Sequence, residues 1–280
     1  MQLINTIKEL NSLLESLDKS KTIGLVPTMG ALHLGHLSLI EQAVKENDFT
    51  IVSIFVNPTQ FDNKEDLAKY PNTLNEDISL LKSVSDNLII FAPNANEIYS
   101  GNISSQSYDF EGLENVMEGE FREGHFNGVG TIVEKLLTLT NPTRAYFGEK
   151  DFQQLQIIRK LVEIKNLPVT IIGCPIVREP SGLAMSSRNE RLSESLRKEA
   201  AFIYKTLKSA KEKIGTKSVG YVIHWAKEEF SKHPSLDLEY IKIVDEAKLQ
   251  AVDTIDKSTK YRAFVAVYAG DVRLIDNIAL

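Results

Sequence analysis

The chain has 280 residues, of which 42% are hydrophobic, so it can bury a sizeable core as one large domain or two moderate ones. Its formal net charge of -6 is of mixed sign, with no basic stripe for nucleic acid and no polybasic segment for a membrane surface. No apolar run approaches the roughly 18 residues of a transmembrane helix. We therefore expect a cytoplasmic protein whose partners are small molecules, with no nucleic acid and no membrane.

Residues 1–21 carry apolar side chains at helical spacing, interleaved with charged ones. The apolar positions are Leu3, Ile7, Leu10, Leu14 and Leu17. A signal peptide would need a continuous apolar core and a small-residue cleavage site. The segment therefore predicts an amphipathic helix.

Strands and helices alternate through the first 177 residues. We expect strands at residues 23–26, 49–56, 88–91, 144–147 and 169–177, and helices starting near His36, at 73–83, before Asn141-Pro142, and at 152–165. Strands that are apolar on both faces and alternate with helices predict a parallel sheet covered by helices. Residues 62–72 are polar and turn-rich, and residues 94–115 are irregular enough for a lid or an interface segment.

The pattern changes after residue 177. Residues 178–189 are predicted to form a loop, which divides a Rossmann-like domain at 1–177 from a smaller α+β domain at 178–280. In the second domain we expect helices at 193–214 and 219–233 and strands at 238–244, 261–268 and 273–276. Gly270-Asp271 between the last two strands is typical of a hairpin turn.

Two histidines stand in the loop after the first predicted strand. If His36 opens the following helix, imidazole donors and the helix N-terminus converge on one spot that suits a phosphate. Gly30 and Gly35 let the backbone approach such a ligand closely. A turn with two surface histidines, His33 and His36, is the other interpretation, and the flanking strand and helix favour the phosphate site.

Further polar clusters follow other predicted strands, where ligands bind in open parallel sheets. They are Asn57 and Gln60, Lys150 and Asp151, and Ser186, Ser187 and Arg188. An ammonium, two hydroxyls and a guanidinium suit a triphosphate and a departing pyrophosphate. Taken singly, Lys150 fits a solvated ion pair and Ser186 a helix cap, but together the clusters favour an adenylylation site.

The two glutamines Gln60 and Gln154 each supply a donor and an acceptor, which suits a substrate that carries hydroxyls beside a carboxylate. Arg122 and His125 precede a helix and fit either an anion contact or a packed loop. His224 and His233 receive no role.

Glu76 and Asp77 could approach a magnesium ion that nucleotide phosphates hold, although an exposed acidic pair is the favoured interpretation. No metal site made only of protein ligands is evident. The single cysteine, Cys174, lies in an apolar run and is interpreted as a buried strand thiol rather than a nucleophile.

The H-x-G-H pattern resembles the signature of the nucleotidyltransferase superfamily, and the full set of motifs resembles the pantothenate synthetase (pantoate–β-alanine ligase) family. The motifs are P-T-M-G-A-L-H-L-G-H at 27–36, F-V-N-P-T-Q-F at 55–61, G-H-F-N-G-V at 124–129, A-Y-F-G-E-K-D-F-Q-Q-L at 145–155, G-L-A-M-S-S-R-N at 182–189 and R-L-I-D-N at 273–277. They span nearly the whole chain.

The resemblance implies that ATP and pantoate form pantoyl adenylate and pyrophosphate, after which β-alanine displaces AMP to give pantothenate. It implies an ATP site at Met29, Gly30, Ala31, Leu32, His33, Leu34, Gly35, His36, Gly148, Glu149, Lys150, Asp151, Val177, Met185, Ser186, Ser187 and Arg188. Within that set the expected catalytic residues are His33, His36, Lys150, Ser186, Ser187 and Arg188, with His36 as the proton donor. Gln60 and Gln154 match residues that hold pantoate, and we place Asn57 in the substrate site with them.

The resemblance also implies Mg2+ with the ATP, a homodimer, and a second domain that closes over the site. The chain departs from the family pattern at Asn72, Glu123 and Ser181. Two alternatives stay open: a nucleotidyltransferase that moves AMP or CMP onto a phosphorylated acceptor, and a nucleotide-binding regulatory module without turnover.

Overall fold

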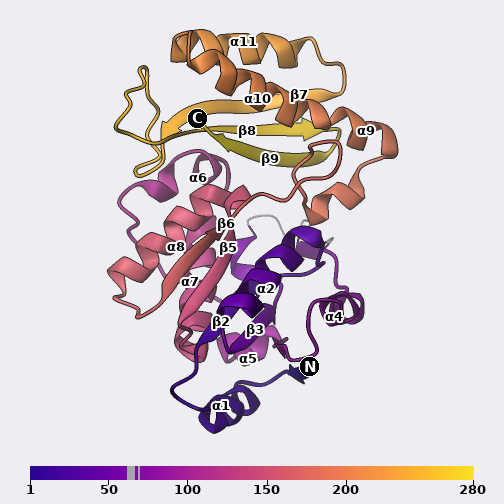
Figure 1. Ribbon diagram of the computed structural model, residues 1–280, viewed down its shortest axis with the longest axis vertical. Coiled ribbons are helices and arrows are strands. Elements are labelled where there is room, and N and C mark those ends of the chain that lie inside the picture. The colour runs from indigo at the N-terminus through magenta and orange to yellow at the C-terminus, as the bar shows by residue number, and fades with distance from the viewer. Residues whose placement is uncertain (62–66, 69) are drawn as a thin grey trace. The chain divides into compact units, whose positions relative to one another are not determined.

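The computed structural model describes residues 1–61, 67–68 and 70–280, and the chain forms two compact units (Figure 1). Unit 1 comprises Met1–Glu149 and Gln153–Pro175, and unit 2 comprises Lys150–Phe152 and Ile176–Leu280. The domain roles expected from the sequence stay predictions. The predicted turn-rich stretch at 62–72 includes positions 62–66 and 69, which lie outside the described residues.

Unit 1 is built on a parallel sheet. Its strands are β1 (Gln2–Ile4), β2 (Ile23–Thr28), β3 (Phe49–Ile54), β4 (Ile89–Phe91), β5 (Arg144–Gly148) and β6 (Thr170–Cys174). Its helices are α1 (Ile7–Ser16), α2 (Leu34–Glu46), α4 (Leu74–Lys82), α5 (Ala95–Tyr99), α6 (Glu118–Phe121) and α7 (His125–Thr140), the 3-10 turns η1 (Pro58–Gln60) and η2 (Leu113–Asn115), and all but the first residue of α8 (Phe152–Ile164). The short turn η3 (Glu149–Asp151) precedes α8.

The strand order among the described residues is β1-β4-β3-β2-β5-β6, and every pairing is parallel. Val26, Val52 and Ile90 lie in register on neighbouring strands and pack in one apolar cluster with the α2 side chains. Their neighbours along the strands, Leu25, Ile51 and Phe91, point to the opposite sheet face and are fully buried, so both faces are covered. This arrangement confirms the predicted Rossmann-like α/β sheet.

The first residues of the chain correct the sequence-based prediction. Residues 2–4 form a strand paired with β4, and the helix begins only at Ile7. Thr6 and Glu9 make a capping box, in which the Thr6 hydroxyl accepts from the Glu9 N–H at 3.2 Å. A single helix over 1–21 was wrong because this start signal outweighs the periodic position of Leu3, which is exposed.

Residues 94–115 contain α5 and η2, and part of the segment is buried in unit 1. Phe110 is fully buried, and a Cβ on Gly130 of α7 would lie 3.1 Å from its ring. This packing does not suit a lid, while an interface role stays a prediction.

Unit 2 is a three-stranded antiparallel sheet with helices, among the residues that the structure describes. Its regular elements are η4 (Ser187–Arg191), α9 (Glu194–Glu199), α10 (Ala201–Ile214), α11 (Val219–Ser231), β7 (Leu236–Asp245), β8 (Tyr261–Ala269) and β9 (Val272–Ala279). The helices α10 and α11 pack on the sheet (Figure 1), and Gly270, at φ +61°, makes the predicted turn between β8 and β9. The expected helix at 193–214 is two helices, broken at Ala200.

The predicted loop at 178–189 has regular hydrogen bonding in part. Arg178 and Ala184 form an antiparallel bridge, and the Met185 N–H donates to the Val177 carbonyl at 3.0 Å. The predicted loop therefore contains one isolated bridge and leads into η4.

Candidate functional site

The histidine loop joins β2 to α2, and His33 rather than His36 is the N-cap of the helix. His33 Nδ1 accepts from the Gly35 N–H at 3.1 Å, and His36 Nδ1 accepts from the His33 N–H at 3.3 Å. The two rings stack with centroids 4.0 Å apart. A neutral imidazole that accepts at Nδ1 carries its proton on Nε2, so Nε2 is the donor of each ring.

This capping pattern changes the expected anion site. The N–H groups of His33 and Gly35 serve the imidazoles, so these two backbone donors are not directed at a ligand as we expected. The partial positive charge of the helix N-terminus still favours an anion near these two capping rings.

Asp77 of α4 holds the histidine loop by a side-chain hydrogen bond. Its Oδ1 accepts from the Leu32 N–H at 2.7 Å and from the Thr73 hydroxyl at 3.3 Å. A Cβ on Gly30, whose φ is +70°, would lie 2.6 Å from Asp77 Oδ2, so the glycine is required for this close approach. The Gly30 carbonyl also accepts from the Tyr70 hydroxyl at 2.8 Å.

Asp77 is 2% exposed, whereas its neighbour Glu76 is exposed. The interpretation of the two as an exposed acidic pair was therefore wrong for Asp77. Burial raises the pKa of the Asp77 carboxyl, although its hydrogen bonds oppose the shift. Asp77 Oδ2 is buried and has no hydrogen-bond partner within the described part of the chain.

Gln60 connects the loop after β2 with the loop after β3. Its Nε2 donates to Met29 Sδ at 2.9 Å, and its Oε1 accepts from Asn57 Nδ2 at 3.2 Å. Asn57 is 1% exposed and also donates to the Gly128 carbonyl at 3.1 Å, while its Oδ1 accepts from the Tyr99 hydroxyl at 2.5 Å. Asn57 thus holds the half-buried Gln60 side chain in place through protein contacts.

His125 and Arg122 form a chain of hydrogen bonds that ends at the backbone of the same glutamine. His125 is buried, and its Nδ1 donates to the Gln60 carbonyl at 2.8 Å, because a carbonyl can only accept. Its Nε2 lies 3.1 Å from Arg122 Nη1, which can only donate. These two contacts define a neutral His125 and agree with the packed-loop interpretation, here with a positioning role for Gln60.

The end of β5 and the start of α8 carry the next predicted site residues. Gly148, Glu149 and Gln154 are half-buried in unit 1, whereas Lys150 and the exposed Asp151 belong to unit 2. Lys150 Nζ lies 3.6 Å from Asp151 Oδ1.

The remaining predicted residues, Val177 and Met185–Arg188, also lie in unit 2 and are half-buried. Ser186 caps η4 by accepting from the Arg188 N–H at 3.3 Å, so the cap expected as an alternative is present. The predicted set is therefore divided between the units: unit 1 brings together the histidine loop, Asn57 and Gln60, and unit 2 holds Lys150, Asp151, Val177 and Met185–Arg188.

Sequence reasoning missed four residues that hold candidate site segments: Asp77 at Leu32, Tyr70 at Gly30, Tyr99 at Asn57, and Asn277, whose Nδ2 donates to the Lys150 carbonyl at 2.9 Å. Only Asn277 lay in a quoted motif, the R-L-I-D-N run. The aromatic residues carry no local signal, because their hydroxyls act on segments 40 or more residues away.

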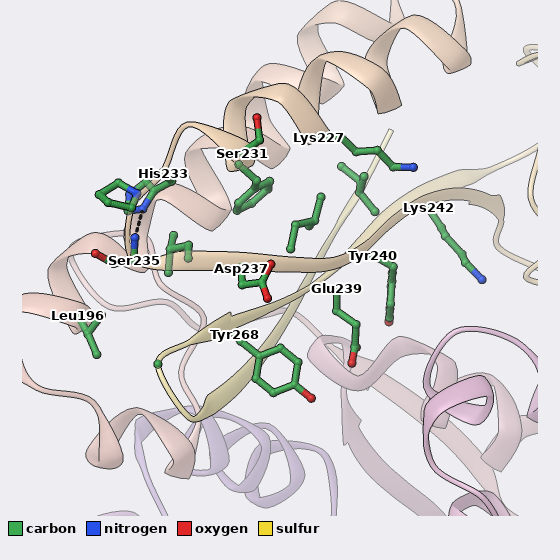
Figure 2. A pocket seen from close by; sticks show the side chains of 16 residues that line it. Leu196, Lys227, Ser231, His233, Ser235, Asp237, Glu239, Tyr240, Lys242 and Tyr268 are labelled. Atoms are coloured by element: carbon green, nitrogen blue, oxygen red, sulfur yellow. Dashed lines mark hydrogen bonds between the residues drawn. The ribbon is translucent and has the colours of Figure 1, made fainter.

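An open groove of about 1000 Å³ runs along β7 in unit 2 (Figure 2). Its lining contains none of the predicted site residues. In Figure 2, His233 faces the Ser235 backbone, whose N–H donates to its Nδ1 at 3.4 Å. No group of three metal-ligating side chains occurs in the described ranges, and no helix there is long and apolar enough to cross a membrane.

Cys174 is 2% exposed, and burial raises the pKa of its thiol to about 11. The interpretation as a buried strand thiol is confirmed.

The chain resembles known proteins along its whole length. The family model for pantoate-beta-alanine ligase matches residues 2–279. A pantothenate synthetase of Christiangramia forsetii is 56% identical over 281 residues, covering 99% of each chain. Another, of Flavobacterium psychrophilum, is 54% identical over 264 residues, covering 94% of each chain.

Solved structures agree with this similarity. The crystal structure of pantothenate synthetase from Thermus thermophilus matches with a TM-score of 0.90 at 39% identity and covers 99% of each chain. Pantoate-beta-alanine ligase from Francisella tularensis, complexed with beta-gamma ATP and beta-alanine, matches with a TM-score of 0.82 at 40% identity and covers 99% of this chain and 97% of that one. The chain therefore belongs to the pantoate–β-alanine ligase family.

Proposed function

We infer that this chain condenses pantoate with β-alanine at the expense of ATP and releases pantothenate, AMP and pyrophosphate. In the first step a pantoate carboxylate oxygen attacks the α-phosphorus, and the bond to the bridging oxygen breaks as pyrophosphate leaves. In the second step the β-alanine amine attacks the acyl carbon, AMP leaves with the bonding electrons, and the nitrogen gives up a proton as the amide forms. Neither step requires a nucleophilic side chain, so catalysis consists of alignment and charge stabilisation.

The observation that carries this proposal is the paired cap at His33 and His36. Two imidazoles held by backbone donors at Nδ1 are fixed with Nε2 as their donor atom, and that is the atom that would donate to phosphate oxygens. We assign Met29 through His36 to the nucleotide. In this arrangement His36 acts as a hydrogen-bond donor to phosphate, and proton transfer from Nε2 stays a separate prediction.

We assign pantoate to Gln60 and Gln154. Gln60 is held by Asn57 on one side and by Met29 on the other, so its amide has a defined orientation. An amide offers both a donor and an acceptor, which fits a hydroxy acid better than it fits a phosphorylated acceptor. Asn57 contributes by orienting Gln60.

We assign the β- and γ-phosphates to Lys150, Ser186, Ser187 and Arg188, with Gly148, Glu149, Asp151, Val177 and Met185 as further nucleotide contacts. These residues supply the ammonium, hydroxyl and guanidinium donors that stabilise charge on departing pyrophosphate. The homodimer, the cytoplasmic location and closure of the second domain are predictions of the family resemblance.

Magnesium is the ion that the family implies for ATP. The buried Oδ2 of Asp77, without a hydrogen-bond partner among described residues, fits one carboxylate ligand to an ion that phosphate oxygens otherwise hold. When bound, the ion would neutralise phosphate charge. Asp77 also holds the Leu32 N–H through its other oxygen, so it would tie the ion to the loop.

The test is product analysis with ATP, magnesium, pantoate and β-alanine, together with pantoate-dependent exchange of labelled pyrophosphate into ATP. We expect exchange without β-alanine and pantothenate only when β-alanine is added. Exchange that needs a phosphorylated acceptor would support the other nucleotidyltransferase. ATP binding without exchange or product would support the regulatory module.

A further inference from the structure

Lys150–Phe152 packs with unit 2, although the chain on both sides of it packs with unit 1. The Phe152 ring is buried, and the guanidinium carbon of Arg262 on β8 lies 3.9 Å from its centroid. The Lys150 carbonyl accepts from Asn277 Nδ2 on β9 at 2.9 Å. Two strands of unit 2 therefore hold both ends of this segment.

The Asn277 amide has one possible orientation. Arg262 Nη1 donates to Asn277 Oδ1 at 2.6 Å, and a guanidinium cannot accept, so Oδ1 must face Arg262 and Nδ2 must face Lys150. Arg262 is itself fixed by Glu246, whose Oε1 accepts from its Nε at 2.8 Å. Asn277 is 1% exposed, which excludes water as a ready substitute partner.

The preceding residue holds the other phosphate-binding element. Asp276 accepts two hydrogen bonds from Arg178, at 2.6 and 2.9 Å, and Arg178 donates to the Gly182 carbonyl at 3.1 Å. Arg178 also stacks on Tyr204, 3.5 Å from the ring centroid. Two consecutive residues of β9 thus hold the Lys150 backbone and the hairpin that leads to Ser186.

We propose that Asn277 is a positioning residue for Lys150, oriented by Arg262, and that it acts in adenylate formation by fixing the backbone from which the lysine ammonium reaches the ATP phosphates. This inference rests on the proposed role of Lys150. A long lysine side chain samples many rotamers, so a fixed backbone carbonyl reduces the conformations in which the ammonium misses the phosphates. In the R-L-I-D-N motif, Asp276 would thus hold Arg178 and Asn277 would hold the Lys150 backbone.

The principal variant is Asn277→Asp. A carboxylate retains the size of the amide and the contact with Arg262, but it places an acceptor oxygen against the Lys150 carbonyl. We expect pantoate-dependent pyrophosphate exchange to slow by about 10- to 100-fold. Arg262→Lys, a second variant, should slow exchange by a smaller factor, because it frees the Asn277 amide without reversing its polarity. Glu239→Gln, which removes an ion pair to Arg273 on the same strand as Asn277, is the control and should exchange at the normal rate.

A double-mutant cycle with Lys150→Ala distinguishes positioning from general damage. We expect Asn277→Asp to cause no further loss in the Lys150→Ala background. The reaction of preformed pantoyl adenylate with β-alanine should keep its rate in a single turnover, because that step releases no pyrophosphate. Multiplying losses in the cycle, or an equal loss in both half-reactions, would overturn the inference. Normal exchange in Lys150→Ala itself would instead overturn the proposed role of Lys150.

Discussion

Gly128 lies in α7 where this helix contacts η1, and Gly128→Ala tests whether this close approach positions Gln60. A Cβ at this position would lie 2.2 Å from the Thr59 carbonyl oxygen and 2.7 Å from Gln60 Cα. Non-bonded carbon atoms rest about 3.5 to 4 Å apart, so the helix and η1 must separate by about 1 Å. Gln60 would move with its backbone.

The matched control is Gly220→Ala in α11, where a Cβ meets nothing within 4 Å. Both substitutions gain the helix propensity of alanine, about 1 kcal/mol, so their difference isolates the steric clash. Overpacking costs about 1 to 3 kcal/mol, which corresponds to a Tm roughly 2 to 12 °C below that of the control.

The functional consequence is measured by steady-state kinetics. A shift of about 1 Å in a substrate-positioning group can cost about 100-fold, so kcat/KM for pantoate should fall by that order in Gly128→Ala. The KM for ATP should change less, as we also expect for Gln60→Ala. A Gly128→Ala protein with the control's Tm and normal kcat/KM for pantoate would refute the reasoning.

Three further predictions follow from buried or capping groups. His36→Ala removes the acceptor of the His33 N–H, so it should cost about 1 kcal/mol in urea unfolding and abolish pyrophosphate exchange; near-normal exchange would contradict the assigned role. Burial raises the pKa of Asp77 above its ordinary 3.8, so the folded protein favours the protonated carboxyl. The free energy of unfolding therefore falls as the pH rises through the folded-state pKa and Asp77 ionises. Asp77→Asn should therefore raise the Tm at pH 7 in the absence of nucleotide and increase the magnesium concentration for half-maximal rate, and the idea fails if neither changes. Cys174, with a pKa of about 11, should resist alkylation at pH 8 in the native protein and react after unfolding, as mass spectrometry can detect.

Short-range patterns in the sequence were sufficient for the α/β class and for the order of most elements. The apolar runs that became β2 to β6 and the turn at Gly270 depend on residues within a few positions of one another. The N-terminal segment shows the limit of periodicity, because the apolar spacing of Leu3 fits a helix while a capping box at Thr6 starts the helix later. Pairing with β4, more than 80 residues away, then makes the first residues a strand.

The sequence by itself determined the family and gave the chemical groups of the candidate site, since H-x-G-H and the other motifs are contiguous runs of residues. Only the tertiary structure decided how those groups are held. Asp77 reaches Leu32 across 45 positions, His125 reaches Gln60 across 65, and Asn277 reaches Lys150 across 127. The physical reason is that a buried donor or acceptor must find a partner wherever the folded chain places one, and no local pattern encodes that partner.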